Sequence, residues 1–308
     1  MNSSFAPVVL FVYNRPDKTR ATLETLRSNS LASQSDLFVF SDAAKNERAR
    51  KGVELVREYL DGIGEGFQSV QVIRREENWG LAKSVIEGVS EVLREYGRVI
   101  VVEDDIRTAP QFLQFMNDAL DYYQNQPRVF SVSGCHMPFE VSKNYSFDAY
   151  FTYRAMSWTW GTWLDCWENV DWKVEDYSDF LRDSKRMARL GKGGNDLCDM
   201  LDGQMRSKIN SWAIRWCYHH AKHDAYGICP RGGLINNTGL DGSGTHSDGN
   251  EVITVWDEDF PKENFRFPEI VKIDEEINLN LAKVFEVPMF LSLRRRIGRK
   301  LRMLKGEY

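Results

Sequence analysis

The sequence has few cysteines, no long apolar run and no low-complexity segment. None of its five cysteines forms a C-x-x-C pair, which argues against a structural zinc site, and their odd number argues against a disulfide scaffold. No segment approaches the roughly 20 apolar residues of a membrane-spanning helix. The short apolar run near the N-terminus follows no basic region, so we expect no signal peptide. Together these features predict a protein of the reducing cytoplasm.

The overall composition is that of a folded globular protein. Of the 308 residues, 28% are charged and 42% hydrophobic, which excludes a disordered chain and a fibrous one. The length suits one large domain or two ordinary ones. Because no linker interrupts the chain, we expect one continuous domain over residues 1–289 and a separate extension over residues 290–308.

Charge is distributed unevenly between these two parts. Residues 290–308 carry seven basic residues and one acid, a net charge of +6, and the rest of the chain carries −11. An acidic body argues against nucleic acid as a partner. Apolar residues recur at helical spacing in the extension, at Leu293, Ile297, Leu301 and Leu304. This pattern predicts an interfacial helix on the inner face of an anionic membrane, with packing on the protein's own domain as the alternative.

Apolar periodicity predicts alternating strands and helices in the first hundred residues. The expected strands are Val8–Tyr13, Leu37–Phe40, Val70–Arg74 and Arg98–Val102, and the expected helices are Asp17–Ser28, Glu47–Leu60 and Gly80–Tyr96. This alternation implies βαβ units and an α/β fold with a mainly parallel sheet. Further along we expect helices at Pro110–Gln124, Asp179–Leu190 and Ser211–His223, a strand at Val129–Val132 and a loop at Ile235–Asn250.

Polar residues follow three of the four expected parallel strands. They are Asn14-Arg15, Ser41-Asp42 and Glu103-Asp104-Asp105. Ligands of open α/β sheets bind at the carboxyl ends of the strands, so we expect these groups to converge there. Three adjacent acids repel one another, and Mg²⁺ or Mn²⁺ held by one or two carboxylates and a substrate diphosphate would relieve that repulsion. The alternative is that the acids only cap the next helix.

Four motifs in this order resemble those of GT-A glycosyltransferases. They are Asn14-Arg15-Pro16, Ser41-Asp42, Asn78-Trp79-Gly80-Leu81 and Val101–Pro110. The last of these motifs contains a Glu-Asp-Asp form of the D-x-D motif. The resemblance covers residues 7–172. It is closest to Golgi N-acetylglucosaminyltransferases that initiate complex N-glycans, and it extends to bacterial family 2-like sugar transferases. It implies a single Rossmann-like GT-A domain with a mixed, mainly parallel sheet.

The resemblance also implies an activity. It is inverting transfer of a hexosyl or N-acetylhexosaminyl group from a nucleotide-diphosphate sugar, a UDP-sugar above all, to a glycan or lipid-linked acceptor in surface polysaccharide synthesis. Carried over by position, Asp105 binds Mn²⁺ or Mg²⁺, and Glu103 and Asp104 hold the sugar and ribose of the donor. Asp42 reads the uracil edge, whose N–H suits a carboxylate acceptor, and Asn14 and Arg15 lie near the nucleotide.

The general base required by an inverting transfer has no clear residue. The resembled enzymes have an Asp just before a Trp. At the matching place this chain has Asn210, two positions before Trp212. An amide cannot act as a carboxylate base. Asp202 and Asp165 are the other candidates. A catalytically weakened sugar-nucleotide-binding protein is therefore an alternative. A nucleotidyltransferase is another, although the residues after the first strand lack its Gly-rich basic signature.

Two further segments suggest substrate contacts. The aromatic stretch Tyr150–Trp172 is mostly expected to be core, with Trp158 and Trp160 beside Gly161 as walls of the acceptor site. The Gly-rich segment 239–246 resembles a late loop that closes over the donor diphosphate, so Gly244 and His246 are assigned to donor binding. The alternative for this segment is an ordinary surface loop.

Overall fold

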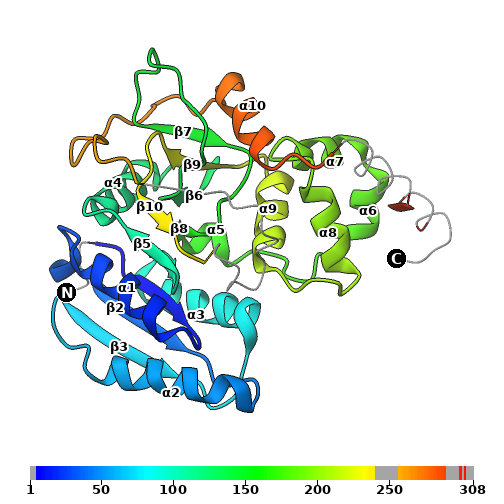
Figure 1. Cartoon of the computed structure of the whole chain (residues 1–308). Coiled ribbons are helices and arrows are strands. Elements are labelled where there is room, and N and C mark those ends of the chain that lie inside the picture. The colour runs from blue at the N-terminus through cyan, green and yellow to red at the C-terminus, as the bar shows by residue number, and fades with distance from the viewer. Residues whose placement is uncertain (1–4, 240–255, 289–297, 300–301, 303–308) are drawn as a thin grey trace.

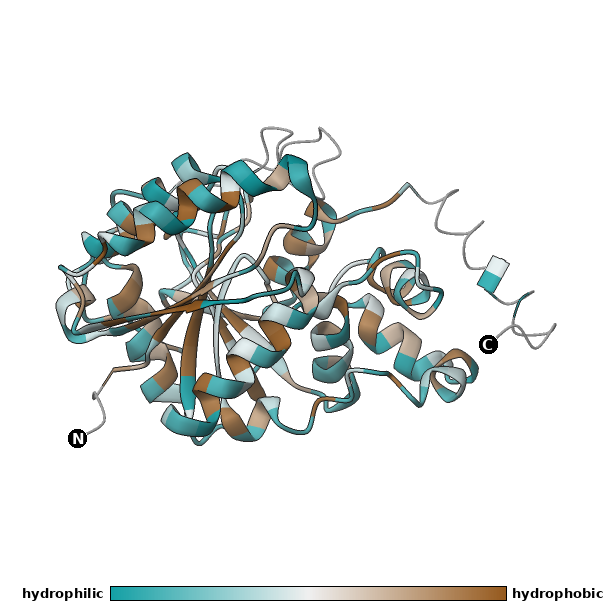
Figure 2. Cartoon of the chain, turned by 90° about the horizontal axis from the view of Figure 1, so that it is seen from below, coloured by the Kyte–Doolittle hydropathy of each residue, from teal (hydrophilic) through white to brown (hydrophobic). Residues whose placement is uncertain are grey.

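The structure is a computed structural model that describes residues 5–239, 256–288, 298, 299 and 302. Its centre is an eight-stranded mixed sheet with the strand order β3-β2-β1-β4-β8-β6-β9-β7, and helices cover both faces (Figure 1). Figure 2 shows the strands as a hydrophobic layer between helices whose polar residues point outward. The expected fold class, a single α/β domain with a mixed and mainly parallel sheet, is confirmed.

The first half of the chain is a parallel βαβ array. Its strands and helices are β1 (Val8–Val12), α1 (Pro16–Arg27), β2 (Asp36–Ser41), α2 (Glu47–Asp61), β3 (Ser69–Arg74), α3 (Gly80–Tyr96) and β4 (Arg98–Glu103). β1 lies between β2 and β4 and is parallel to both. All five of its residues are buried, which explains why its sequence is a continuous apolar run rather than an alternating one.

The second half completes the sheet with strands of both directions. Its elements are β5 (Ile106–Thr108), α4 (Phe112–Tyr123), β6 (Val129–Ser133), β7 (Ala149–Thr152), β8 (Thr159–Trp163), α5 (Leu164–Trp167), α6 (Tyr177–Arg182), α7 (Ser184–Gly191), α8 (Leu197–Met205), α9 (Trp212–Lys222), β9 (Tyr226–Pro230), β10 (Ile235–Asn237) and α10 (Glu275–Val284). β8 runs antiparallel to β4, with Trp163 opposite Arg98 and Thr159 opposite Val102. The chain direction therefore reverses at the middle of the sheet.

A second, two-stranded sheet lies beside the end of β4. β5 follows the three acids directly, and β10 pairs with it in antiparallel register, with Ile235 opposite Thr108 and Asn237 opposite Ile106. This pairing brings a segment from late in the chain against the acidic motif (Figure 1).

Tryptophans fill the core between β8 and the helices α5 and α9. The ring of Trp160 stacks on Trp167 at 5.1 Å and on Trp212 at 4.9 Å between ring centroids, and Trp216 packs edge-on against Trp167 at 5.1 Å. Much of the aromatic surplus of the sequence is thus ordinary core, as expected for most of this stretch.

Three expectations about elements were wrong or incomplete. The single helix expected at Asp179–Leu190 is two helices, α6 and α7, because Asp183 leaves the helical conformation and caps α7, accepting hydrogen bonds from the amides of Lys185 and Arg186. The segment at Ile235–Asn250, expected to be a loop, begins with strand β10. α8, β9 and α10 were not expected at all.

The C-terminal extension is described at only three residues, and two of them contact α8. Arg299 forms an ion pair with Asp199, and Nη2 of Arg302 lies 2.7 Å from Oδ2 of Asp202. These contacts agree with the alternative in which the extension packs on its own domain. The rest of the expected amphipathic helix lies outside the described residues. Among the described helices, none has both the length and the apolar character needed to span a bilayer.

Candidate active site

The polar ends of β1, β2 and β4 meet at one edge of the sheet, as expected for parallel strands. Val12 lies opposite Ser41, and Phe11 lies opposite Glu103. A pocket of about 490 Å³ opens at this edge. It is lined by Phe11, Val12, Tyr13, Asn14, Arg15, Phe40, Asp42, Lys45, Asn78, Gly80, Leu81, Ser84, Glu103 and Asp104. The first three motifs and the first two acids of the fourth thus surround one cavity.

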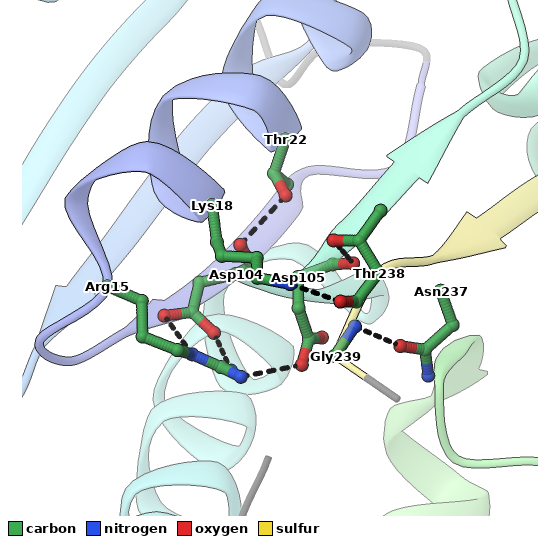
Figure 3. A network of polar contacts seen from close by, with 8 residues as sticks. All are labelled: Arg15, Lys18, Thr22, Asp104, Asp105, Asn237, Thr238 and Gly239. Atoms are coloured by element: carbon green, nitrogen blue, oxygen red, sulfur yellow. Dashed lines mark hydrogen bonds and ion pairs between the residues drawn. The ribbon is translucent and has the colours of Figure 1, made fainter. Parts of the chain in front are cut away.

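Arg15 joins two of the three acids at one end of this pocket (Figure 3). Its guanidinium forms a two-pronged ion pair with Asp104, in which Nη2 bonds Oδ1 and Nε lies 3.4 Å from Oδ2. Nη1 of the same guanidinium lies 2.9 Å from Oδ2 of Asp105. Arg15 is the residue just before α1, so the start of this helix fixes where its side chain begins.

The backbone of the acidic motif is held by two other segments. The hydroxyl of Thr22 in α1 donates to the carbonyl of Asp104 at 2.9 Å. Thr238 donates to the carbonyl of Asp105 from its amide at 2.9 Å and from its hydroxyl at 2.8 Å, and Lys18 donates to the carbonyl of Thr238. Figure 3 shows these residues as one network between α1, β4 and the end of β10.

Gly239 makes the closest approach to Asp105. A Cβ atom built on Gly239 would lie 1.9 Å from Oδ2 and 2.7 Å from Cγ of Asp105, so only glycine allows this backbone to pass the carboxylate. Sequence reasoning missed Lys18, Thr22 and Thr238 as site residues, and it placed Gly239 only as the first residue of the expected closing loop. The glycine content of that loop was the only signal of this arrangement.

Asp105 has one carboxylate oxygen that fits a metal ion. The residue is 8% exposed, and its Oδ1 is buried without a hydrogen-bond partner. A buried carboxylate oxygen left without a partner is costly, and a divalent cation would satisfy it. In the part of the chain that the structure describes, no three His, Cys, Asp or Glu residues form a complete metal-binding group. That agrees with a cation that takes most of its ligands from a diphosphate and water.

Burial shifts the protonation of the acids. Desolvation, assisted by the charges of Asp105 and Asp104, raises the pKa of Glu103 well above its usual range. Desolvation also raises the pKa of Asp104 to about 6, although Arg15 opposes the shift. Burial lowers the pKa of Arg15, but its ion pairs with both aspartates outweigh burial and the net pKa is raised. Burial therefore favours the protonated form of Glu103, in which the carboxyl group can donate a hydrogen bond.

Asp42 lies in the pocket but uses its carboxylate internally. Its Oδ1 accepts from the amides of Ala43 at 3.0 Å and Trp79 at 2.9 Å. Its Oδ2 accepts from Nδ2 of Asn78 at 3.0 Å and from the amide of Gly80 at 2.9 Å. Four N–H donors match the roughly four acceptor positions of a carboxylate. Instead of offering a free edge to uracil, as expected, Asp42 joins the end of β2 to the start of α3.

The end of the pocket away from Arg15 is less polar. It is formed by Phe40 of β2 and by Leu81 and Ser84 of α3. Ser84 is 6% exposed, and its hydroxyl oxygen is buried without a hydrogen-bond partner. An aromatic floor with a few polar groups at its rim is the usual character of a pocket for a planar ring.

The two tryptophans expected at the acceptor site lie in different environments. Trp158 precedes Thr159, which is opposite Val102, so it lies at the same sheet edge as the acids. It lines a separate pocket of about 120 Å³ with residues that include Arg154, Met200 and Phe285. Trp160 is wholly buried in the tryptophan core. This burial corrects the expectation that Trp160 forms a wall of the acceptor site.

None of the three residues considered for the general base lines the 490 Å³ pocket. Asn210 is exposed before α9, and its Oδ1 lies 3.3 Å from Nη2 of Arg215. Asp202 is buried in α8, where it accepts from the hydroxyl of Tyr177 at 3.1 Å and pairs with Arg302. These partners occupy Asp202, which corrects its assignment as a free base.

Asp165 lies at the wrong edge of the sheet. It follows β8, whose last residue, Trp163, is opposite Arg98 at the start of β4. β4 is six residues long, so at about 3.3 Å per residue its two ends are roughly 16 Å apart. The assignment of Asp165 as base is therefore corrected by the antiparallel direction of β8. Gly244 and His246 lie outside the described residues, and their assignment to donor binding stays a prediction.

An α/β sheet with a pocket at its carboxyl edge has the arrangement in which open α/β proteins usually bind ligands. The family follows from a sequence comparison: the model of glycosyl transferase family 2 matches residues 8–168. This is more than half of the chain, so the protein belongs to this family. The expected resemblance to GT-A glycosyltransferases is confirmed at this level, whereas the likeness to Golgi N-acetylglucosaminyltransferases is not shown.

Two solved structures are weakly similar to the chain. A mannosyltransferase from Pyrobaculum calidifontis, solved with GDP-Man and Mn²⁺, is 14% identical, with a TM-score of 0.38 over 57% of this chain and 51% of that chain. TarS of S. aureus, residues 1–349, is 11% identical, with a TM-score of 0.41 over 76% of this chain and 60% of that chain. The matches thus cover less than two thirds of those chains, and these similarities are too low to assign a substrate. A search of curated proteins gave no match.

Proposed function

We propose that the protein transfers a sugar, with inversion, from a nucleotide-diphosphate donor to a glycan or lipid-linked acceptor, with the help of Mn²⁺ or Mg²⁺. A UDP-sugar is the donor that the sequence motifs favour. The observation that carries the proposal is the unpartnered, buried Oδ1 of Asp105. The other oxygen of this carboxylate contacts Arg15, which lines the pocket. The family membership of residues 8–168 supports the reaction class.

Each group at the acidic end has a role in this proposal. Oδ1 of Asp105 would hold the divalent cation, which when bound neutralises negative charge on the leaving diphosphate. Glu103, whose protonated form burial favours, would donate a hydrogen bond to the sugar or ribose. Asp104 and Arg15 fix each other, so that the acids keep one arrangement.

The less polar end suits the nucleobase. Leu81, which is exposed, offers apolar surface, and the unpartnered hydroxyl of Ser84 offers a hydrogen bond to a base edge. Asp42 acts indirectly here, by holding Asn78 and the start of α3 in place. Trp158 is kept as an acceptor contact, because it lies at this sheet edge beside a second pocket. The identity of the general base is not part of the proposal.

Calorimetric titration with UDP tests the metal-dependent site. We expect UDP to bind more tightly with Mn²⁺ than with EDTA, and Asp105→Asn to abolish the difference because the oxygen that faces the cation is lost. Asp61→Asn serves as the control, since Asp61 is an exposed acid paired only with Arg74. UDP affinity that is the same with and without Mn²⁺ would refute the cation site.

Product analysis separates the proposed reaction from its alternatives. A transferase releases UDP from a UDP-sugar in the presence of acceptor. A nucleotidyltransferase instead releases pyrophosphate from UTP and a sugar phosphate, and a binding protein releases neither. Chromatography therefore distinguishes the three functions when UDP-glucose and UDP-N-acetylglucosamine reactions with a glycan acceptor mixture are run beside a reaction of UTP with a sugar phosphate.

A further inference from the structure

The acidic end of the pocket already contains a cation of the protein's own. The guanidinium of Arg15 contacts both Asp104 and Asp105. We propose that Arg15 competes electrostatically with the divalent cation for Asp105, so that the free protein binds the cation weakly and binds it tightly only together with a diphosphate. This inference concerns the order of binding and rests on the cation site proposed above.

The geometry gives the two cations different oxygens of one carboxylate. Oδ2 of Asp105 lies 2.9 Å from Nη1 of Arg15, and Oδ1 is buried without a partner. A metal ion on Oδ1 would lie within about 6 Å of the guanidinium, since the two oxygens belong to one carboxylate. At that separation two positive charges repel strongly, above all where water is largely excluded. The side chains of Asp105 and Arg15 are only 10% and 26% exposed, so solvent screens this repulsion poorly.

Arg15 is not free to leave when the metal arrives. Two of its hydrogen bonds go to Asp104, whose side chain is 5% exposed. Its backbone is also fixed, because the carbonyl of Arg15 accepts from the amide of Thr19 in the first turn of α1 at 2.9 Å. Its ion pairs keep the guanidinium charged. The repulsion must therefore be relieved by new negative charge, which the diphosphate of a donor supplies.

The consequence is thermodynamic coupling between cation and nucleotide. If the diphosphate raises the affinity for Mn²⁺ by some factor, Mn²⁺ raises the affinity for the diphosphate by the same factor. Arg15 weakens the binding of Mn²⁺ alone, and the negative charge of a bound diphosphate offsets that repulsion. Removing the charge of Arg15 should therefore strengthen binding of Mn²⁺ alone, the opposite of what loss of a simple binding residue would do.

Electron paramagnetic resonance of free Mn²⁺ measures this affinity without any turnover. We expect Arg15→Gln to bind Mn²⁺ alone at least about tenfold more tightly than the wild type. Arg15→Lys keeps the charge and should resemble the wild type. Lys51→Gln is the control, because Lys51 is an exposed lysine of α2 that does not line the pocket. Circular dichroism melts confirm that each variant is folded.

The other possible outcomes of these measurements also test the proposed role of Arg15. Equal or weaker binding of Mn²⁺ alone by Arg15→Gln would overturn the proposal, since Arg15 would then support the site rather than compete with it. Should Arg15→Gln fail to fold, the wild type still tests the proposal: less than tenfold coupling between UDP and Mn²⁺ would overturn it. If the wild type binds no UDP at all, the proposed function fails, but the comparison of Mn²⁺ affinities still tests the role of Arg15.

Discussion

Replacing Asp42 by Asn is the sharpest test of how the pocket is built. The two side chains have the same shape, but Asn turns one of the two carboxylate oxygens into an NH₂ group. In the structure, each oxygen accepts two N–H donors. Whichever way the amide turns, two donors therefore face another donor in place of an acceptor.

The cost follows from those two broken hydrogen bonds. Asp42 is 8% exposed, so water reaches the stranded donors poorly. Leaving a buried donor unsatisfied costs about 1–3 kcal/mol. We therefore expect Asp42→Asn to lower the free energy of unfolding by about 2–5 kcal/mol. Asp61→Asn should cost at most about 1 kcal/mol, as is usual for an exposed ion pair.

Urea denaturation, followed by circular dichroism, measures both variants, and UDP titration of the same samples completes the experiment. If Asp42 reads the nucleobase directly, the variant should keep its stability and lose selectivity for UDP over other nucleoside diphosphates. If it holds the pocket together, stability falls. A variant as stable as the wild type would refute the role assigned to Asp42 here.

Two further predictions concern other features. Gly239→Ala should lower the Mn²⁺-dependent affinity for UDP at least tenfold in calorimetry, because its Cβ would lie 1.9 Å from Oδ2 of Asp105 and about 1.5 Å of movement is needed to relieve the overlap. Gly62→Ala, where the nearest atom is 3.7 Å away, should leave that affinity unchanged, and equal affinities in both variants would contradict the argument. Burial lowers the pKa of His220 from 6.5 to about 3, so only the unfolded chain gains a proton as the pH falls below 6.5. Urea denaturation should therefore show about 2 kcal/mol less stability from this residue at pH 5 than at pH 7, and His220→Asn should flatten the dependence, whereas an unchanged slope would contradict it.

The first hundred residues could be predicted well because their signals are local. Each strand is a short apolar run, each helix shows an apolar face, and consecutive parallel strands place their ends at one edge. That rule alone was enough to bring Arg15, Asp42 and Glu103 to one pocket. It did not reveal that Asp42 is saturated, because its donors at Asn78, Trp79 and Gly80 come from the next turn of the chain.

The second half was harder because chain direction is not encoded locally. Asp165 and Asp105 both lie shortly after a strand in the sequence. Only the antiparallel pairing of β8 places Asp165 at the opposite edge of the sheet. Trp158 and Trp160 are two residues apart, yet Trp158 precedes β8 and lines a pocket, whereas Trp160 is buried in the core. The hydrogen bonds from Thr238 to Asp105 join residues more than a hundred positions apart, and no periodicity predicts such a contact.

The hydrogen bonds between Thr238 and the acidic motif also have a consequence for synthesis on the ribosome. Chains are made from the N-terminus, and the parallel array of β1 to β4 is complete long before residue 238 leaves the exit tunnel. During that interval, the acidic motif lacks the two hydrogen bonds from Thr238 and the close packing of Gly239. A nascent chain halted before β10 would therefore carry the acidic motif without the contacts that Thr238 and Gly239 make with it.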